Sequence, residues 1–169
     1  NTTGTENVAV GRGALEDNVS GTQSVAVGGY ALANDTTGGN SAVGYKALYT
    51  NTTGDHVTAL GYNALELNTT GNNNVAVGYK ALEANTTANN NVAVGANALD
   101  ALNGSGGNNI AIGYEALGSI TTGEHNVAVG SYALDANNGN NNVAIAVHAL
   151  GSNTTGGNNV AIGMHALGS

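Results

Sequence analysis

A phrase of about seventeen residues repeats along the whole chain and limits what the chain can fold into. Each copy holds an alanine, a branched apolar residue and then a glycine, replaced once by Ala146, with Ala-Leu three and four residues after it. Successive copies are 16 to 18 residues apart. The first alanines of the ten copies are Ala9, Ala26, Ala42, Ala59, Ala76, Ala93, Ala111, Ala128, Ala144 and Ala161.

Each copy contains one segment with the period of a β-strand. In residues 74–77, Asn-Val-Ala-Val, the valines alternate with Asn74 and Ala76, so the two pairs should point to different faces. We expect Val75 and Val77 to face the interior together with Leu82, which ends a second short extended piece over residues 79–82. Helices are excluded because the apolar spacing does not follow 3.6 residues and the segments between glycine-rich breaks are too short.

Turn-forming residues separate the strands, and all the variation in repeat length falls there. An insertion at residues 103–107 should therefore bulge into solvent without changing the strand register. These patterns predict an all-β protein, a parallel β-solenoid of about ten coils in which residues 1–169 form a single repeat array.

Composition excludes several classes of function. The 169 residues include no Cys, and three cations against eleven acids give a net charge of −8, which argues against a nucleic-acid surface. No apolar run approaches the roughly 20 residues of a membrane span. No triad spacing or phosphate loop is present, so we expect no enzyme activity, no catalytic residue, no cofactor and no metal site.

The invariant alanine column is a candidate contact surface. A ridge of methyl groups lets another backbone approach closely, so Ala9, Ala26, Ala42, Ala59, Ala76, Ala93, Ala111, Ala128, Ala144 and Ala161 are predicted to contact other subunits of a homo-oligomer. The alternative is that they fill a narrow interior corner of the coil.

Tyrosine follows the glycine in four copies and supplies candidate ligand contacts: Tyr45, Tyr62, Tyr79 and Tyr114. Such a ladder could contact a glycan, or it could pack against a neighbouring subunit. The recurring Thr-Thr pairs offer an ice-binding alternative, although several copies lack them. His148 and His165 share a position on successive copies, but two ligands are fewer than a metal site needs.

The repeats at residues 7–11, 40–44 and 159–163 (NVAVG, NSAVG, NVAIG) resemble the head repeats of trimeric autotransporter adhesins. Residues 68–82, NTTGNNNVAVGYKAL, resemble repeats of phage tail fibres even more closely. These resemblances cover the whole chain and imply a left-handed parallel β-roll, a homotrimer and an extracellular position on a cell surface or virion. They also imply a non-enzymatic role in display or attachment to surfaces, with a host-surface glycan or protein as partner.

The first and last copies look like interior ones and carry no atypical polar cap. We therefore expect the array to be a segment of a longer fibre, or its copies to stack end to end into a filament.

Overall fold

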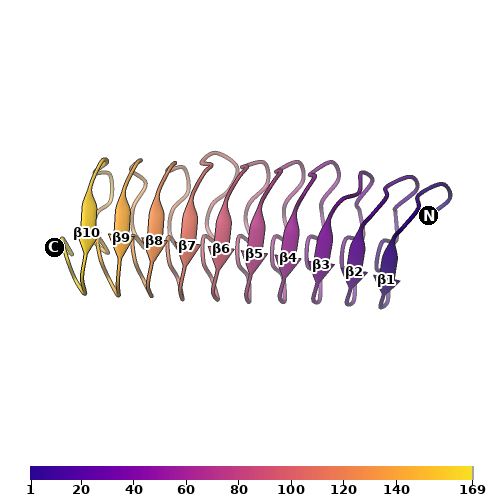
Figure 1. Ribbon diagram of the computed structural model, residues 1–169, viewed down its shortest axis with the longest axis horizontal. Helices are drawn as coiled ribbons and strands as arrows, with labels where there is room; N and C mark the ends of the chain where they lie inside the picture. Colours follow the sequence, from indigo (N-terminus) through magenta and orange to yellow (C-terminus); the bar gives the residue numbers. More distant parts are fainter. Residues whose placement is uncertain (169) are drawn as a thin grey trace.

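The computed structural model describes residues 1–168, which form one rod of stacked coils with the N- and C-termini near its two ends (Figure 1). Each coil contributes one strand of three residues. The strands are β1 (Val8–Val10), β2 (Val25–Val27), β3 (Ser41–Val43), β4 (Thr58–Leu60), β5 (Val75–Val77), β6 (Val92–Val94), β7 (Ile110–Ile112), β8 (Val127–Val129), β9 (Val143–Ile145) and β10 (Val160–Ile162).

All ten strands belong to one parallel sheet, in which each strand pairs with the next one along the chain. The register matches equivalent positions of successive repeats, so that Ala76 pairs with Ala93 and Val75 with Val92. The insertion at residues 103–107 leaves this register unchanged, because Ala93 pairs with Ala111 across it. The predicted parallel β-solenoid with a repeat of about seventeen residues is confirmed. Neighbouring strands of a β-sheet lie about 4.8 Å apart, which sets the rise expected for each coil.

The prediction of which strand residues face inward is wrong. In β5, Ala76 is fully buried while Val75 and Val77 remain partly exposed, and Asn74 before the strand is also buried. The interior of the coil is narrow and is filled by alanine, leucine and asparagine side chains. Leu82 is fully buried, as predicted, but it meets alanines across the interior, and the branched residues line the outside.

The predicted second extended piece at residues 79–82 is a series of turns. Lys80 and Leu82 adopt φ angles of 56° and 53°, in the left-handed region, so the backbone bends sharply where a strand would continue straight. Hydrogen bonds between coils persist through these turns, as from Leu82 N to Ala98 O at 3.0 Å. The turn therefore keeps the backbone paired while it brings the leucine into the interior.

Glycine before this turn meets two requirements at once. Gly78 has a φ of 141°, which side-chain-bearing residues rarely adopt, and a Cβ there would collide with the backbone of Gly95 on the next coil. Ala146 occupies the same position in the ninth repeat with a φ of 106°. That coil carries backbone strain that its neighbours avoid.

Asparagine side chains form hydrogen bonds inside the rod, as stacked amides should. Asn74 donates from Nδ2 to the backbone oxygen of Ala88 at 2.7 Å and accepts from the backbone amide of Asn91 at 2.9 Å. These contacts fix the turn of one coil and the start of the next strand.

Candidate functional site

Nine of the ten alanines that were predicted to contact other subunits lie inside the coils, and Ala9 on the first coil is exposed. The nine are at most 3% exposed within a single copy. A side chain already covered by its own coil cannot touch another subunit. The prediction of the alanine column as an oligomer contact is therefore wrong, and the alternative of a narrow interior corner describes these residues.

The outer face of the sheet is instead lined by branched apolar side chains, one on each side of the alanine column. The column that contains Val77 is apolar on all ten coils, whereas the column that contains Val75 carries Ser41 and Thr58 on two of them. The most exposed apolar members of the two columns are 36 to 69% accessible to solvent. We call this surface the apolar face. Its most exposed members are Val8, Val10, Val25, Val43, Leu60, Val94, Ile110, Ile112, Ile145, Val160 and Ile162.

Sequence reasoning missed this face, although one signal for it exists. Ser41 and Thr58 take the place of Val75 in two repeats, whereas the alanine position never varies. A column that accepts polar residues is more consistent with an outward position, because a polar group buried without a partner costs free energy.

The structure brings three of the four predicted tyrosines together. Tyr45 stacks on Tyr62 with ring centroids 5.4 Å apart, and Tyr62 stacks on Tyr79 at 5.6 Å. The interplanar angles are 23° and 18°, and the three side chains are 43 to 51% exposed. Since neighbouring rings cover one another, the middle ring offers a ligand its edge and hydroxyl and not its flat face.

Tyr114 stands apart from this stack because the coil between it and Tyr79 carries Ala96 at this position. Its ring meets Tyr132 edge to face at 5.3 Å. Hydrogen bonds to Glu115 and Tyr132 raise the pKa of Tyr114 to about 12. Three of the predicted tyrosines therefore form one stack, and Tyr114 begins a second aromatic row that continues through Tyr132.

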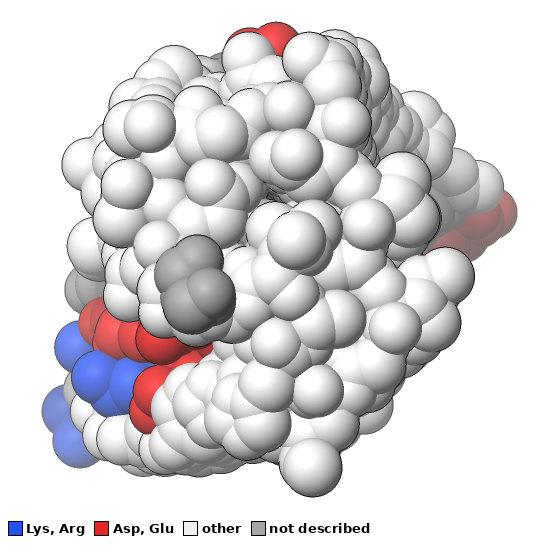
Figure 2. All heavy atoms as spheres, turned by 90° about the vertical axis from the view of Figure 1, so that its left-hand side faces the viewer, with Lys and Arg blue, Asp and Glu red and all other residues white. Residues whose placement is uncertain are grey.

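Charged side chains lie beside the stack. Lys46 forms an ion pair with Glu66 at 3.0 Å, and Lys80 pairs with Glu83 at 3.1 Å. Each ammonium group also lies near a tyrosine ring, as Lys46 does 5.3 Å from the Tyr49 centroid. Viewed along the rod from its C-terminal end, the basic side chains gather with acidic ones at one side of the molecule, and further acidic side chains lie elsewhere on its surface (Figure 2).

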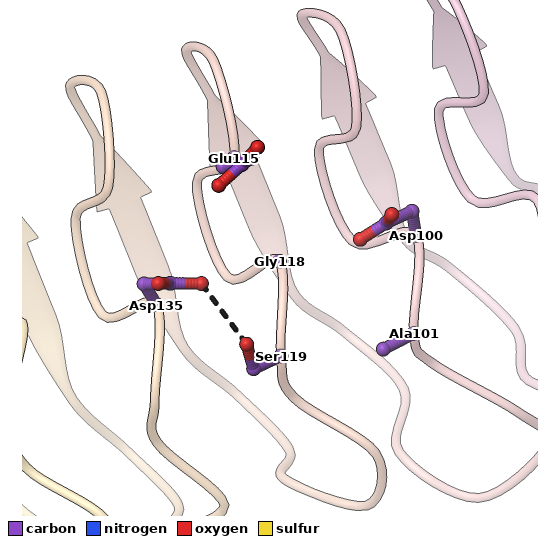
Figure 3. Close-up of a pocket in the computed structure, with 6 residues that line it drawn as sticks. All are labelled: Asp100, Ala101, Glu115, Gly118, Ser119 and Asp135. Carbon is purple, nitrogen blue, oxygen red and sulfur yellow. Dashed lines mark hydrogen bonds between the residues drawn. The ribbon is translucent and has the colours of Figure 1, made fainter.

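Farther along the rod, a shallow hollow of about 310 Å³ is lined by Asp100, Glu115 and Asp135 together with Ala101, Gly118 and Ser119 (Figure 3). The Ser119 hydroxyl donates to Asp135 at 3.2 Å. Burial, together with a smaller effect of the neighbouring carboxylates, raises the pKa of Asp100 to about 6. Burial also raises the pKa of Asp135. All three cations of the chain precede this hollow in the sequence.

The histidines do not converge. His148 stacks between Tyr132 and His165, with ring centroids 4.8 and 5.1 Å away. His56 contacts the adjacent Asp55 at 3.1 Å. Residues 1–168 contain no group of three or more histidine, cysteine or acidic side chains arranged to hold a metal ion.

The first threonine of several Thr-Thr pairs donates its hydroxyl proton within the turns. Thr36 donates from Oγ1 to the backbone oxygen of Thr52, Thr52 to Thr69 and Thr69 to Thr86, at distances of 2.7 to 3.0 Å. These hydroxyl protons link successive coils, whereas the second threonines Thr53 and Thr70 are exposed to solvent. The ice-binding alternative stays a prediction.

Comparisons with known protein families, curated proteins and solved structures return no match. The part of the chain that the structure describes contains no helix long and apolar enough to cross a membrane.

Proposed function

We propose that this chain is a non-enzymatic structural segment of an extracellular fibre, from a phage tail fibre or a bacterial surface adhesin, that serves in display or attachment to surfaces. The observation that carries the proposal is the apolar face, which extends along a rod of ten coils and has at least one branched apolar side chain on every coil. A face of this length in an otherwise polar coil is typical of an element built for assembly.

The partner on this face is a second copy of the chain. A partner that follows the rod must place apolar side chains at the same rise of about 4.8 Å for each coil. Another copy presents this spacing over its full length. We therefore propose a homotrimer of left-handed coils, in which three apolar faces meet along a common axis, in agreement with the resemblance to adhesin and tail-fibre repeats.

The assembly gives the coil a second core. A single coil buries mainly alanine and one leucine in each repeat, and alanine contributes little apolar area. Valine and isoleucine supply larger side chains, and on the proposed axis they would be removed from water. Folding and assembly would then be coupled, as in obligate oligomers.

Substitutions on the apolar face test the proposal. We expect the natural chain to sediment with the mass of three copies, and Val94→Lys combined with Ile112→Lys to give single copies or unfolded chains. A matched double variant on the turns, Thr53→Lys with Thr70→Lys, should remain trimeric because both residues are exposed outside the face. A natural chain that sediments as a stable single copy would refute the proposed assembly.

Glycan contact at the tyrosine stack is the second candidate function. The observation in its favour is that the stack stops at Ala96, so Tyr79 has an aromatic neighbour on one side and a methyl group on the other. A sugar ring could pack against an aromatic face that no other ring covers. A glycan array with the natural chain and Tyr79→Ala tests this reading, and Tyr49→Ala serves as a control outside the stack.

A further inference from the structure

A column of amides inside the turns follows one bonding rule. Asn85 donates from Nδ2 to Asn68 Oδ1 at 2.9 Å, and Asn68 donates to Asn51 Oδ1 at 2.8 Å. Each of these Nδ2 groups also donates to the backbone oxygen three residues later in its own turn. From Asn85 to Asn51, each amide therefore donates to Oδ1 of the amide on the preceding coil, whereas Leu102 and Ile120 occupy this position on the next two coils.

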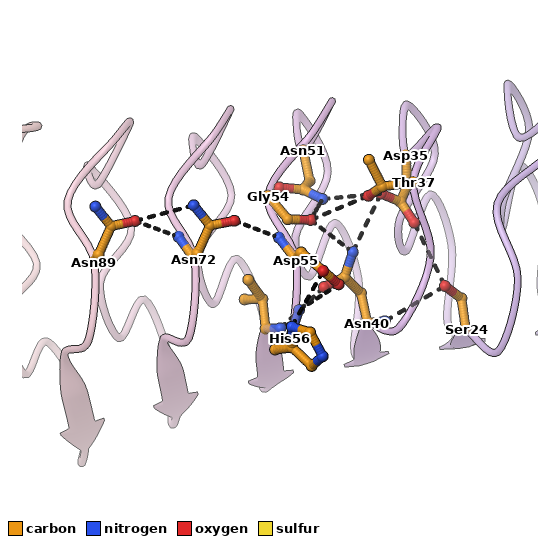
Figure 4. A network of polar contacts seen from close by, with 11 residues as sticks. Ser24, Asp35, Thr37, Asn40, Asn51, Gly54, Asp55, His56, Asn72 and Asn89 are labelled. Carbon is orange, nitrogen blue, oxygen red and sulfur yellow. Dashed lines mark hydrogen bonds and ion pairs between the residues drawn. The ribbon is translucent and has the colours of Figure 1, made fainter.

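Aspartate interrupts this column at the second coil. The backbone amide of Asp35 donates to Leu32 O at 3.3 Å, as that of Asn51 does to Leu48 O at 3.4 Å, so the two residues hold equivalent positions. Asp35 Oδ1 accepts from Asn51 Nδ2 at 2.9 Å, which is the bond that the rule requires (Figure 4). The Asp35 side chain is fully buried.

The two carboxyl oxygens of Asp35 have different surroundings. Oδ1 also accepts from Thr37 at 3.1 Å and from Asn40 at 3.2 Å, whereas Oδ2 accepts only a long hydrogen bond of 3.5 Å from the Ser24 hydroxyl (Figure 4). Oδ2 thus takes the place of the Nδ2 group that donates to the preceding coil in the other rungs.

The preceding rung is Asn18, and its bonding is incomplete. Asn18 donates to Gly21 O at 3.4 Å, as the other rungs donate to their own turns. Its Oδ1 is buried and has no hydrogen-bond partner within residues 1–168. This oxygen is the one to which the next rung should donate. An ionised carboxylate has no proton to give, but a carboxylic acid has one.

The surroundings of Asp35 are uncharged. No ion pair joins Asp35 to another residue of the described chain. On the flanking coils, Asp17 is exposed to solvent, and Asp55 contacts the exposed His56. Burial raises the pKa of Asp35 above 3.8, and hydrogen bonds from Thr37, Asn51 and Asn40 oppose this shift.

We propose that Asp35 is a proton-binding site in the interior of the rod, where the neutral acid donates from Oδ2 to Asn18 Oδ1 and completes the amide column. When Asp35 loses its proton, its carboxylate is a charge in an uncharged interior. Asp35 Oδ2 and Asn18 Oδ1 then face each other as two acceptors with no proton between them. Because the folded chain favours the protonated form, this site stabilises the fold fully below the unfolded pKa of Asp35. That stabilisation is lost as the pH rises through the folded pKa.

Asp35→Asn tests the proposal, because it restores the residue that other coils carry. The melting temperature of the variant and of the natural chain should be compared from about pH 3 to about pH 8. The difference in melting temperature between the variant and the natural chain should increase with pH. The total increase should be about 3 to 5 °C for each unit by which folding raises the Asp35 pKa. An advantage that stays constant or shrinks as the pH rises would overturn the proposal.

Two matched variants sharpen the comparison. Asn68→Asp in the Asp35→Asn background moves the acid to another rung and should restore the pH dependence. Asp55→Asn in the natural chain removes an acid outside this column and should leave the pH dependence of stability in place. If Asn68→Asp restores nothing, or if Asp55→Asn abolishes the effect, the pH dependence does not arise from the column.

A direct titration remains decisive even if a variant fails to fold. The 13C resonance of the Asp35 carboxyl carbon in the natural chain should titrate with a midpoint above the ordinary value of 3.8. A midpoint at or below that value would mean that the hydrogen-bond donors hold Asp35 as a carboxylate, and the proposal would be wrong.

Discussion

The backbone amide of Asn91 donates to the side-chain oxygen of Asn74 at 2.9 Å, so an amide on one coil holds the start of the next strand. The same bond links Asn109 to Asn91 at 3.0 Å and Asn126 to Asn109 at 2.9 Å. The strands have only three residues each, and these side chains extend the pairing of coils beyond them.

Asn74→Ala should destabilise the fold by about 2 to 5 kcal/mol, because it leaves the buried Asn91 amide and the Ala88 carbonyl oxygen without that partner. Denaturant unfolding measures the effect. Thr70→Ala, at an exposed turn position, should change stability by less than about 0.5 kcal/mol. Equal losses of stability in the two variants would contradict a structural role for the asparagines that precede the strands.

Leu82→Ala should cost about 2 to 5 kcal/mol, because Leu82 is fully buried and its removal leaves a cavity in a narrow interior. Leu67→Ala is the matched control, since it deletes the same atoms from a side chain that is 44% exposed. Thermal unfolding of both variants separates the two sites. If Leu67→Ala costs as much as Leu82→Ala, the interior has been placed incorrectly.

Ala146→Gly should stabilise the chain by up to about 2 kcal/mol, because alanine at a φ of 106° carries strain that glycine lacks, while glycine loses more entropy on folding. Gly78→Ala should act in the opposite sense, since its Cβ would meet the backbone of Gly95. Melting temperatures decide the signs. A lower melting temperature for Ala146→Gly would show that the alanine methyl contributes more than its strain costs.

Asp100→Asn should raise the melting temperature above about pH 6 and have less effect below about pH 4. Burial raises the pKa of Asp100 to about 6, so the folded chain favours the protonated form, and ionisation lowers stability as the pH rises through that value. Melting curves in the Asp35→Asn background isolate this contribution. A larger benefit at acid pH than at neutral pH would contradict the assignment.

Much of the fold follows from the sequence because a period of about seventeen residues can be recognised without any structure. The strand positions and the buried Leu82 follow from the apolar spacing and the glycines. The inward direction of Ala76 does not, because alternation separates two sets of residues without saying which set faces in. General rules place valine inside, but at the strand positions the narrow coil buries the alanine and leaves the branched residues on either side of it outside.

The turn at residues 79–82 escaped prediction for a related reason. Its left-handed residues include Leu82 and Lys80, which rarely adopt positive φ, so their sequence gives no local turn signal. The tyrosine stack could be predicted because equal positions on successive coils must lie close together. The acidic hollow and the Asp35 site depend on side-chain burial across several coils, which the repeat alone does not reveal.

The central claim is that alternate residues of one strand have different roles: the alanine fills the coil interior and the branched residue contacts another copy of the chain. Chemical cross-linking tests this claim most directly. The chain has no cysteine, so Val94→Cys and Ala93→Cys each introduce a single reactive thiol. With a short bis-maleimide reagent under native conditions, Val94→Cys should give chains joined in pairs, and Ala93→Cys should stay unmodified. Unjoined chains from Val94→Cys, or joined chains from Ala93→Cys, would contradict the account.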